Sequence, residues 1–260
     1  MSAVQEAIRR RYGQWARARA SAADASAPVN DGCCGAPDLA NSGCGCGYPA
    51  AELTALGLTP AASLGCGNPT LLADLRPGEV VLDLGSGGGL DVLLSARRVS
   101  PGGHAYGLDA TAEMVALAEG HRARAGIANA TFLQGTMEAI PLADASVDVV
   151  ISNCVINLAE DKATVIREAY RVLRPGGRLA ISDLVELEPL APAVKRDLDA
   201  WAECIAGAIP VQTYTDLLRD AGFTGPQVEV RETMGPADHG GRIGSASIRA
   251  RKPKEPAPGG

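Results

Sequence analysis

Aromatic residues are scarce in this sequence, at 3% of its 260 residues, and only two phenylalanines and two tryptophans are present. Proteins that hold single-stranded nucleic acids commonly stack the bases on such rings. The formal net charge of −6 likewise gives the chain no general attraction for a phosphate backbone. The arginines near the start are expected to coat a helix. We therefore predict that nucleic acid is not a partner.

Long hydrophobic runs are missing as well. No apolar stretch approaches the ~18–20 residues that a membrane-spanning helix needs, and the basic N-terminus lacks the apolar segment of a signal peptide. We expect no membrane association and a cytoplasmic location. Hydrophobic residues still make up 46% of the chain and charged residues 21%, which is an ordinary balance for one α/β domain with a full core.

Histidine is limited to His104, His121 and His239, which fall in a predicted strand, helix and loop without a shared motif. The sequence therefore offers no histidine as a general base. Cysteine is plentiful by contrast, and in a reducing compartment so many cysteines are more typical of metal binding or catalysis than of a disulfide framework. The seven are Cys33, Cys34, Cys44, Cys46, Cys66, Cys154 and Cys204.

The strongest motif is the stretch EVVLDLGSGGGLD at residues 79–91. A short apolar run containing Asp83 leads directly into glycines, which is typical of a buried strand that feeds a glycine turn and then a helix. Glycine is needed in such a turn because the backbone bends sharply and approaches a ligand with no Cβ in the way. The glycines expected around the ligand are Gly85, Gly87 and Gly89.

This turn differs from the dinucleotide fingerprint GxGxxG, because Leu90 stands at the third glycine position and Asp83 lies two residues ahead of Gly85. The carboxylate would repel a pyrophosphate but would bind an ammonium group. S-adenosylmethionine carries an ammonium group and no phosphate. Asp109 closes the predicted strand HAYGLD, where an acid that holds ribose hydroxyls is expected about 20 residues on. We therefore interpret the turn as an S-adenosylmethionine site.

Strands and helices alternate over the centre of the chain, which predicts an α/β fold with a doubly wound, Rossmann-like parallel sheet. Ligands bind in such sheets at the carboxyl ends of the strands, which places Asn153, Cys154, Met137 and Glu138 on the same rim as Gly85. Strands are predicted at 80–84, 104–108, 130–134, 147–152 and 178–182, and helices at 90–98, 112–125 and 162–173.

The flanking regions are less regular. Residues 3–20 predict a helix with one apolar face, and residues 21–48 predict a mobile, cysteine-rich loop. The expected division is an N-terminal helix and cysteine-rich loop (1–70), a ligand-binding core (71–185), a small α+β extension (186–250) with strands at 227–231 and 245–250, and a disordered tail (251–260).

Three cysteines lie in distinctive surroundings: Cys66 in SLGCGNP, Cys154 in SNCVINL and Cys204 in WAECIAGA. No pair of them has the CxxC spacing of a zinc ribbon or a thioredoxin motif, so the fold must bring them together if they act jointly. The residues alone leave another interpretation open, in which Cys154 and Cys204 are small buried hydrophobic side chains.

Taken together, SNCVINL, SLGCGNP, DLGSGGG, ECIAGA and the segment DKATVIREAYRVLRPGG resemble the arsenite methyltransferases over roughly residues 50–235. A CCG element like that at residues 33–35 is also similar to the family. The glycine turn and the RPGG loop occur in many small-molecule methyltransferases, whereas few of those proteins carry cysteines in all three contexts. SNCVINL is therefore the most specific part of the resemblance.

The resemblance implies a class I methyltransferase fold and the methylation of arsenite and methylarsenite in arsenic detoxification, with trivalent arsenic bound by Cys66, Cys154 and Cys204. It also implies that an N-terminal cysteine joins a redox cycle supported by thioredoxin or glutathione. Cys33, Cys34, Cys44 and Cys46 compete for that role, and Cys44 is taken as the candidate. The cofactor-binding residues implied are Asp83, Gly85, Gly87, Gly89, Asp109, Met114, Met137, Glu138 and Asn153.

Two other functions stay open on the sequence alone. One is methylation of a small molecule at carbon or oxygen by an enzyme with structural cysteines, although no base for such a reaction is evident. The other is non-catalytic binding of a metalloid or of zinc by thiolates, since the four N-terminal cysteines are close in sequence. We expect the protein to be a monomer.

Overall fold

A central β-sheet organises the molecule, which a computed structural model describes over residues 2–21, 48–58, 62, 64–65, 67–234 and 240–254. Within these residues the strand order is β3-β2-β1-β4-β5-β8-β7, with β6 paired to β5 off this path. Neighbouring strands from β3 to β5 are parallel, whereas β8 is antiparallel to both β5 and β7. The strands are β1 (Val80–Leu84), β2 (His104–Asp109), β3 (Ala130–Gln134), β4 (Val147–Asn153), β5 (Leu173–Glu186), β6 (Ile209–Pro210), β7 (Thr224–Met234) and β8 (Ile243–Arg251).

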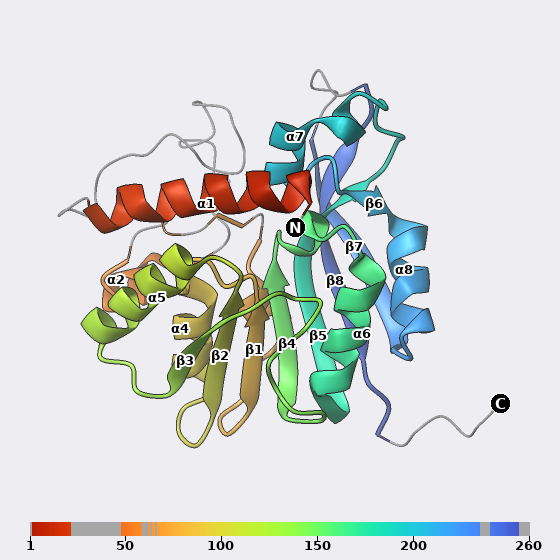
Figure 1. Cartoon of the computed structure of the whole chain (residues 1–260). Coiled ribbons are helices and arrows are strands. Elements are labelled where there is room, and N and C mark those ends of the chain that lie inside the picture. Colours follow the sequence, from red (N-terminus) through yellow and green to blue (C-terminus); the bar gives the residue numbers. More distant parts are fainter. Residues whose placement is uncertain are drawn as a thin grey trace.

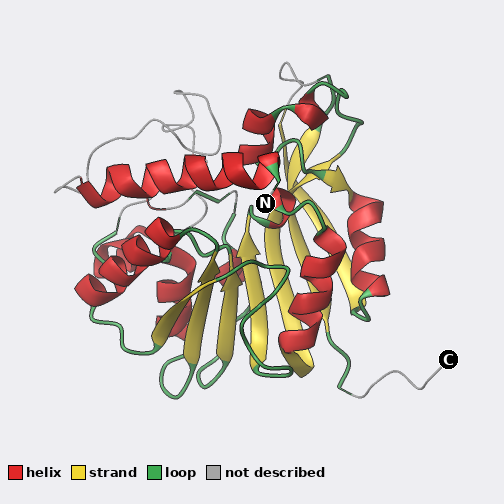
Figure 2. Cartoon of the chain, viewed as in Figure 1, coloured by secondary structure: helices red, strands yellow, loops and turns green. Residues whose placement is uncertain are grey.

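Helices cover both faces of this sheet (Figures 1 and 2). Successive side chains of a strand point to opposite faces, so β1 sends Leu82 and Leu84 into one hydrophobic layer and Val81 into the other. The helices are α1 (Ala3–Ser21), α2 (Ala50–Ala55), α3 (Pro69–Leu72), α4 (Leu90–Arg98), α5 (Ala112–Ala125), α6 (Lys162–Val172), α7 (Leu198–Ala202) and α8 (Val211–Asp220), with short 3₁₀ turns at Ile156–Leu158 and Val194–Arg196.

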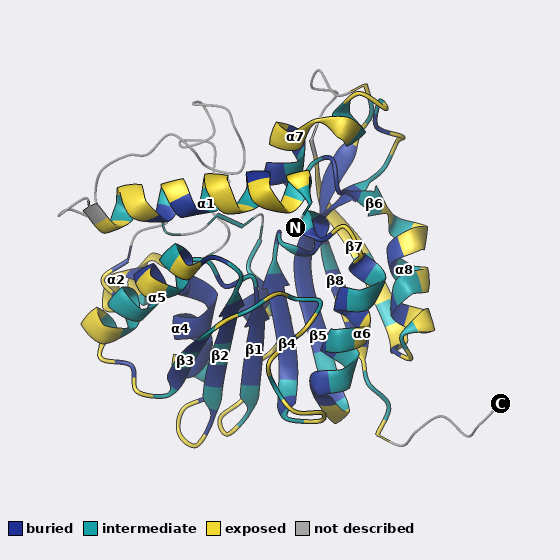
Figure 3. Ribbon diagram, viewed as in Figure 1, coloured by how far each residue is buried: buried dark blue, intermediate teal, exposed yellow. Residues whose placement is uncertain are grey.

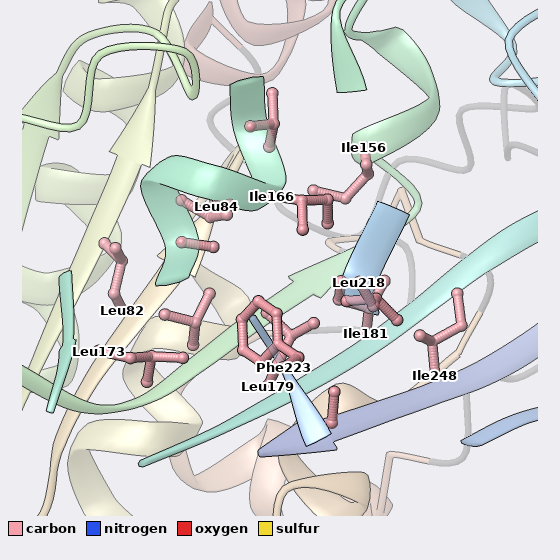
Figure 4. Packing of buried hydrophobic residues seen from close by; sticks show 14 of the residues in the cluster. Leu82, Leu84, Ile156, Ile166, Leu173, Leu179, Ile181, Leu218, Phe223 and Ile248 are labelled. Atoms are coloured by element: carbon pink, nitrogen blue, oxygen red, sulfur yellow. The ribbon is translucent and has the colours of Figure 1, made fainter. Parts of the chain in front are cut away.

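Two hydrophobic clusters fill the space between the sheet and its helices. On one face, Ile166 of α6 and Leu218 of α8 pack in the cluster that contains Leu84 of β1 (Figure 4). On the other face, Leu93 of α4 and Leu53 of α2 join the second cluster. The central strands are buried almost throughout, whereas α1 exposes its outer face (Figure 3). The sheet is therefore a rigid platform, and its carboxyl edge carries the candidate site.

Helix α1 lies across the carboxyl ends of the strands (Figure 1). It packs against both α5 and α7, which come from distant parts of the sequence. Trp15 and Tyr12 of α1 pack on the buried cluster formed by Ala16, Met114 and Leu117. The apolar face predicted for residues 3–20 is thus used to fix the helix above the edge of the sheet.

The structure confirms the predicted α/β fold and its alternating core elements. Two strands extend well beyond the prediction: β5 runs from Leu173 to Glu186 rather than over 178–182, and β7 runs from Thr224 to Met234 rather than over 227–231. The start of β5 pairs with Val147 of β4, whereas its far end and the whole of β7 are lengthened by pairing with β8. The two strands predicted in the C-terminal extension are therefore part of the main sheet.

Some predicted features fall outside the described residues. They include most of the cysteine-rich loop expected at 21–48, Cys66 and the end of the tail. Across the described part of the chain, no helix combines the length and the apolar character that crossing a membrane requires.

Candidate active site

The glycine turn between β1 and α4 adopts a backbone that side chains rarely allow. Gly85, Gly87 and Gly89 have φ angles of 67°, 49° and 84°, in the left-handed region that glycine enters without strain. A Cβ on Gly85 would lie 2.2 Å from Cγ1 of Val155, and one on Gly89 would lie 2.6 Å from Cζ of Phe132. No atom of the described residues lies within 4 Å of the Cβ position of Gly87, so this part of the turn presents open backbone at its middle glycine.

Asp109, at the end of β2, is bonded to this turn. Its carboxylate accepts hydrogen bonds from the backbone N–H of Gly87 at 3.0 Å and from that of Thr111 at 2.8 Å. Burial raises the pKa of Asp109, and the bonds from Thr111 and Gly87 act in the opposite direction. The side chain that the sequence predicts for a ribose diol therefore also sets the shape of the glycine turn.

Two more buried carboxyl groups lie beside it, on Asp83 and Asp91, which are 3% and 7% exposed. Burial raises the pKa of Asp83 well above its ordinary value, and the nearby charges of Asp91 and Asp109 add to the rise. Burial also raises the pKa of Asp91 to about 6, although hydrogen bonds from Tyr48 and Asn153 oppose it. Among the described residues, Oδ1 of Asp83 has no hydrogen-bond partner.

These acids surround a cavity of about 230 Å³ at the carboxyl edge of the sheet. A buried carboxylate oxygen without a partner is costly, and three acids in one cavity favour a cationic ligand, because a nearby positive charge stabilises the ionised form. The cavity is lined by the glycine turn, by residues that follow β2, β3 and β4, and by one side of α1. Its donor and acceptor groups fit a molecule that carries an ammonium group.

Asn153, the last residue of β4, links this cavity to Gly65 and Gly67, which flank Cys66 in the sequence. Its side-chain amide donates to the carbonyl of Gly67 at 2.8 Å and accepts from the Gly67 N–H at 3.2 Å. The same Nδ2 is 3.0 Å from the Tyr48 hydroxyl and 3.2 Å from Oδ2 of Asp91. A Cβ on Gly65 would lie 2.0 Å from Cγ of Asn153. The glycines on both sides of Cys66 are therefore fitted against the strand that leads into Cys154.

Cys154 and Cys204 come from distant loops and lie side by side. They are 3% and 0% exposed, and the Sγ of Cys204 donates to the carbonyl oxygen of Cys154 at 2.6 Å. The hydrogen bond with Cys154, followed by burial, raises the pKa of the Cys204 thiol well above its ordinary value. Both cysteines have a left-handed backbone conformation, with φ angles of 61° for Cys154 and 64° for Cys204. This conformation costs a residue with a side chain roughly 1–2 kcal/mol.

Comparison with known proteins gives the family of this chain. A family model described as a methyltransferase domain matches residues 75–222. The crystal structure of an arsenic(III) S-adenosylmethionine methyltransferase from Chlamydomonas reinhardtii is 36% identical, with a TM-score of 0.70, over 79% of this chain and 75% of that one. The chain belongs to the arsenite methyltransferase family. Class I methyltransferases share the doubly wound fold described above.

Curated relatives agree with this assignment. The arsenite methyltransferase of Halobacterium salinarum is 41% identical over 230 residues, which cover 85% of this chain and 59% of that protein. The arsenite methyltransferase of Aquipseudomonas alcaligenes is 43% identical over 171 residues, which cover 63% of this chain and 49% of that protein. The chain thus spans about half to three fifths of the length of these curated relatives.

Most of the predicted cofactor residues line the cavity, and three of the predicted site residues lie elsewhere. Gly89 packs against Phe132, Met114 is buried with Ala16 and Leu117 beneath α1, and Cys204 is buried behind Cys154. Cys66 and Cys44 lie outside the described residues. The predicted residues that line the cavity are Asp83, Gly85, Gly87, Asp109, Met137, Glu138, Asn153 and Cys154.

Sequence reasoning missed three residues of this site: Tyr12, Tyr48 and Asp91. Tyr12 lines the cavity from α1, and its sequence signal was only that of an apolar helix face. Asp91 accepts a hydrogen bond from the Tyr48 hydroxyl at 2.7 Å. An acid two residues after the last glycine of the turn was visible in the sequence, but its partner Tyr48 is brought to it by the fold.

Proposed function

We propose that this protein methylates trivalent arsenic, as arsenite and methylarsenite, with S-adenosylmethionine as the methyl donor, and that it acts in arsenic detoxification. The observation that carries the proposal is the pairing of Cys154 and Cys204, two buried cysteines from distant loops, at the edge of a cavity rich in carboxylates. The similarity to proteins named as arsenic methyltransferases supports it.

Buried neutral thiols suit the capture of arsenite. Arsenic(III) is soft and prefers sulfur ligands. At neutral pH arsenite is the uncharged hydroxide, and each hydroxyl leaves as water with the proton of one thiol, so three As–S bonds form while three As–O bonds and three S–H bonds break. The raised pKa keeps the Cys204 thiol protonated before capture, and no charge has to be buried.

The third sulfur in this proposal is that of Cys66. Its neighbours support the assignment from both sides. Gly65 is packed against Asn153, and a Cβ on Gly67 would lie 2.6 Å from Oγ of Ser182. The carbonyl of Ser182 accepts the N–H of Cys154 at 2.7 Å. The residues before and after Cys66 thus contact β4 and β5, the same two strands that hold Cys154.

The cofactor is assigned to the cavity beside these cysteines. Asp83 would bind the ammonium group, Asp109 the ribose hydroxyls, and the open backbone at Gly87 the methionyl end, with Met137 and Glu138 beside the adenine. S-adenosylmethionine supplies an electrophilic methyl group, for which the lone pair of arsenic is a suitable acceptor without a general base. The chain holds both partners and excludes water, a contribution that reaches about 7–11 kcal/mol in well-oriented reactions.

The proposal includes a thiol reductant. Gaining a methyl group oxidises arsenic from the trivalent to the pentavalent state, so each further cycle needs two electrons. Two thiols can supply them by forming a disulfide, which thioredoxin or glutathione then reduces. Cys33, Cys34, Cys44 and Cys46 are the candidates, with Cys44 preferred. A variant that lacks all four and still completes multiple turnovers would remove this part of the proposal.

The test is transfer of a labelled methyl group from S-adenosylmethionine to arsenite, measured with Cys66→Ser, Cys154→Ser and Cys204→Ser variants. Each substitution removes one As–S bond, so we expect turnover to fall at least 100-fold while the affinity for S-adenosylhomocysteine stays within about threefold. Transfer to arsenite that survives all three substitutions would show that the cysteines are structural. A parent protein that binds the cofactor but never labels arsenite would refute the proposal itself.

A further inference from the structure

Helix α1 forms one wall of the cofactor cavity. Gln5, Ile8, Arg9 and Tyr12 line it at successive turns of the helix. The other end of the helix is fixed on α5 through Ala16, which packs with Met114 and Leu117. The wall therefore belongs to an N-terminal element that precedes the methyltransferase domain in the sequence.

Tyr12 also reaches away from the cavity, toward the turn that carries Cys204. Its hydroxyl donates to the carbonyl oxygen of Ala202, the last residue of α7, at 3.2 Å. The last four carbonyls of a helix have no partner within the helix, so this hydroxyl satisfies one of them. The next residue, Glu203, pairs with Arg11 of α1 at 3.2 Å, and Cys204 follows.

The turn after Ala202 is tightly specified. The N–H of Cys204 bonds to the carbonyl of Trp201 and that of Ile205 to the carbonyl of Ala200, both at 3.0 Å. This is the pattern of a Schellman motif, and it fixes the direction in which the Cys204 side chain leaves the backbone. A shift of the α7 end would therefore move the sulfur relative to Cys154.

We propose that Tyr12 is a positioning residue that links the cofactor cavity to the Cys204 turn: its ring forms part of the cavity wall, and its hydroxyl holds the end of α7. A ligand that fills the cavity restrains the Tyr12 ring. Because the Tyr12 hydroxyl is bonded to the Ala202 carbonyl, the Cys204 turn is restrained as well. The proposal rests on the proposed function, because it takes Cys204 as an arsenic ligand. Since coupling between two sites is reciprocal, arsenite and the cofactor should strengthen each other's binding.

The test measures arsenite affinity with and without saturating S-adenosylhomocysteine, which fills the cavity but has no methyl group to transfer. Trp201 lies in the Cys204 turn, so its fluorescence in a Trp15→Phe background reports on that turn. We expect S-adenosylhomocysteine to raise the arsenite affinity about tenfold, within the range of about 5–150-fold found for coupled sites. In Tyr12→Phe the rise should shrink to less than about twofold.

Arg11→Gln is the matched control, because Arg11 bonds the adjacent residue Glu203 but does not line the cavity. It should keep the tenfold rise. A second measurement does not depend on any variant: hydrogen exchange of the amides in 201–206 of the parent should slow when S-adenosylhomocysteine binds.

The outcomes separate this inference from the proposed function. A parent protein that does not bind arsenite refutes the proposed function. A parent that binds arsenite with equal affinity in both conditions overturns the link, as does a Tyr12→Phe variant that keeps the full rise. If Tyr12→Phe weakens arsenite binding by the same factor with and without S-adenosylhomocysteine, the hydroxyl only stabilises the fold, and the link is overturned as well.

Discussion

Cys204 occupies a backbone position that glycine usually takes. The left-handed residue of a Schellman motif is commonly glycine, which enters that region without a Cβ penalty, yet here it is a cysteine with φ of 64°. Cys154 shows the same departure with φ of 61°. Strain of this kind persists where the surrounding structure enforces it and often marks functional sites. Two strained cysteines in contact therefore point to a requirement for sulfur.

Replacing Cys204 separates the cost of the backbone from the role of the sulfur. Both Cys204→Gly and Cys204→Ala remove the thiol, but only glycine relaxes the left-handed backbone. We expect the free energy of unfolding of Cys204→Gly to exceed that of Cys204→Ala by about 1 kcal/mol, measured by urea unfolding. Neither variant should bind arsenite at the Trp201-reported site. Equal stabilities would show that the turn imposes no strain, and arsenite binding by Cys204→Gly would contradict the assignment of the ligand.

Asp109 gives a second prediction at this scale. Asp109→Ala removes the acceptor for the Gly87 and Thr111 amides and the carboxylate assigned to the ribose hydroxyls. Hydrogen bonds to charged groups contribute about 1.5–3 kcal/mol, so we expect the affinity for S-adenosylhomocysteine to fall at least tenfold, measured by calorimetry. Arsenite affinity without the cofactor analogue should change less than twofold. Glu113→Gln is the control, because this half-buried residue of α5 does not line the cavity. Equal losses of both ligands in Asp109→Ala would refute the placement.

At the scale of elements, the 3₁₀ turn after Cys154 is braced by one buried lysine. Nζ of Lys162, at the start of α6, donates to the carbonyls of Asn157 at 3.3 Å and Ala159 at 2.8 Å. The same Nζ lies 5.4 Å from the ring centre of Trp201 in α7. Burial lowers the pKa of Lys162 to about 8, although the charge of Asp183 opposes the shift. This side chain therefore holds the segments on either side of the cysteine pair.

Lys162→Met should loosen the packing around Cys154 and Cys204. The variant leaves two carbonyls without a donor, at a cost of about 1–3 kcal/mol each where they stay buried, so we expect the free energy of unfolding to fall by about 2–4 kcal/mol. Cys154 and Cys204 should react faster with a thiol reagent below the unfolding transition. Lys254→Met, on the exposed C-terminal segment, should show neither effect. Unchanged thiol reactivity in Lys162→Met would mean that α6 does not support the cysteine loops.

The elements also show what the sequence could and could not predict. The alternating core was predictable because each apolar run ends at residues that break helices or strands, such as the glycines after β1 and the RPGG segment. The start of β5 at Leu173 was not, because it depends on pairing with Val147 of β4, which the fold brings alongside. Residues 3–20 were recognisable as a helix from their apolar spacing. Their place above the cavity follows from contacts with α5 and α7, which no local pattern encodes.

The same division holds for the candidate site. That Asp83, the glycine turn and Asp109 line one cavity was predictable, because the carboxyl ends of neighbouring parallel strands meet at the same edge of the sheet. The contact between Cys204 and Cys154 was not predictable from spacing, since their loops are fifty residues apart. Tyr12 and Tyr48 were missed for the same reason: their hydroxyls bond groups in distant segments, Ala202 and Asp91.

At the scale of the whole molecule, buried acids make stability depend on pH. Folding raises the pKa of Asp91 to about 6 and that of Asp183 to about 7, chiefly through burial, whereas an unfolded aspartate titrates near 3.9. Between roughly pH 4 and 7 the folded chain therefore holds protons that the unfolded chain has lost. The stability of the unliganded protein should fall as the pH rises through this window and should level off above it.

Asp183→Asn allows this linkage to be tested apart from ligand binding. Asp183 is bonded to backbone amides of Leu184 and Asn157 and does not line the cavity, so the substitution should flatten the fall in melting temperature between pH 5 and 7.5 with or without S-adenosylhomocysteine. The increase in melting temperature caused by that ligand should itself grow over the same range in both proteins, because its ammonium group is bound more strongly once Asp83 has lost its proton. Thermal melts at pH 5, 6 and 7.5 measure both quantities. A ligand increment that is largest at pH 5 would contradict the assignment of Asp83 to the ammonium group, and an unchanged slope in Asp183→Asn would show that Asp183 does not hold the proton.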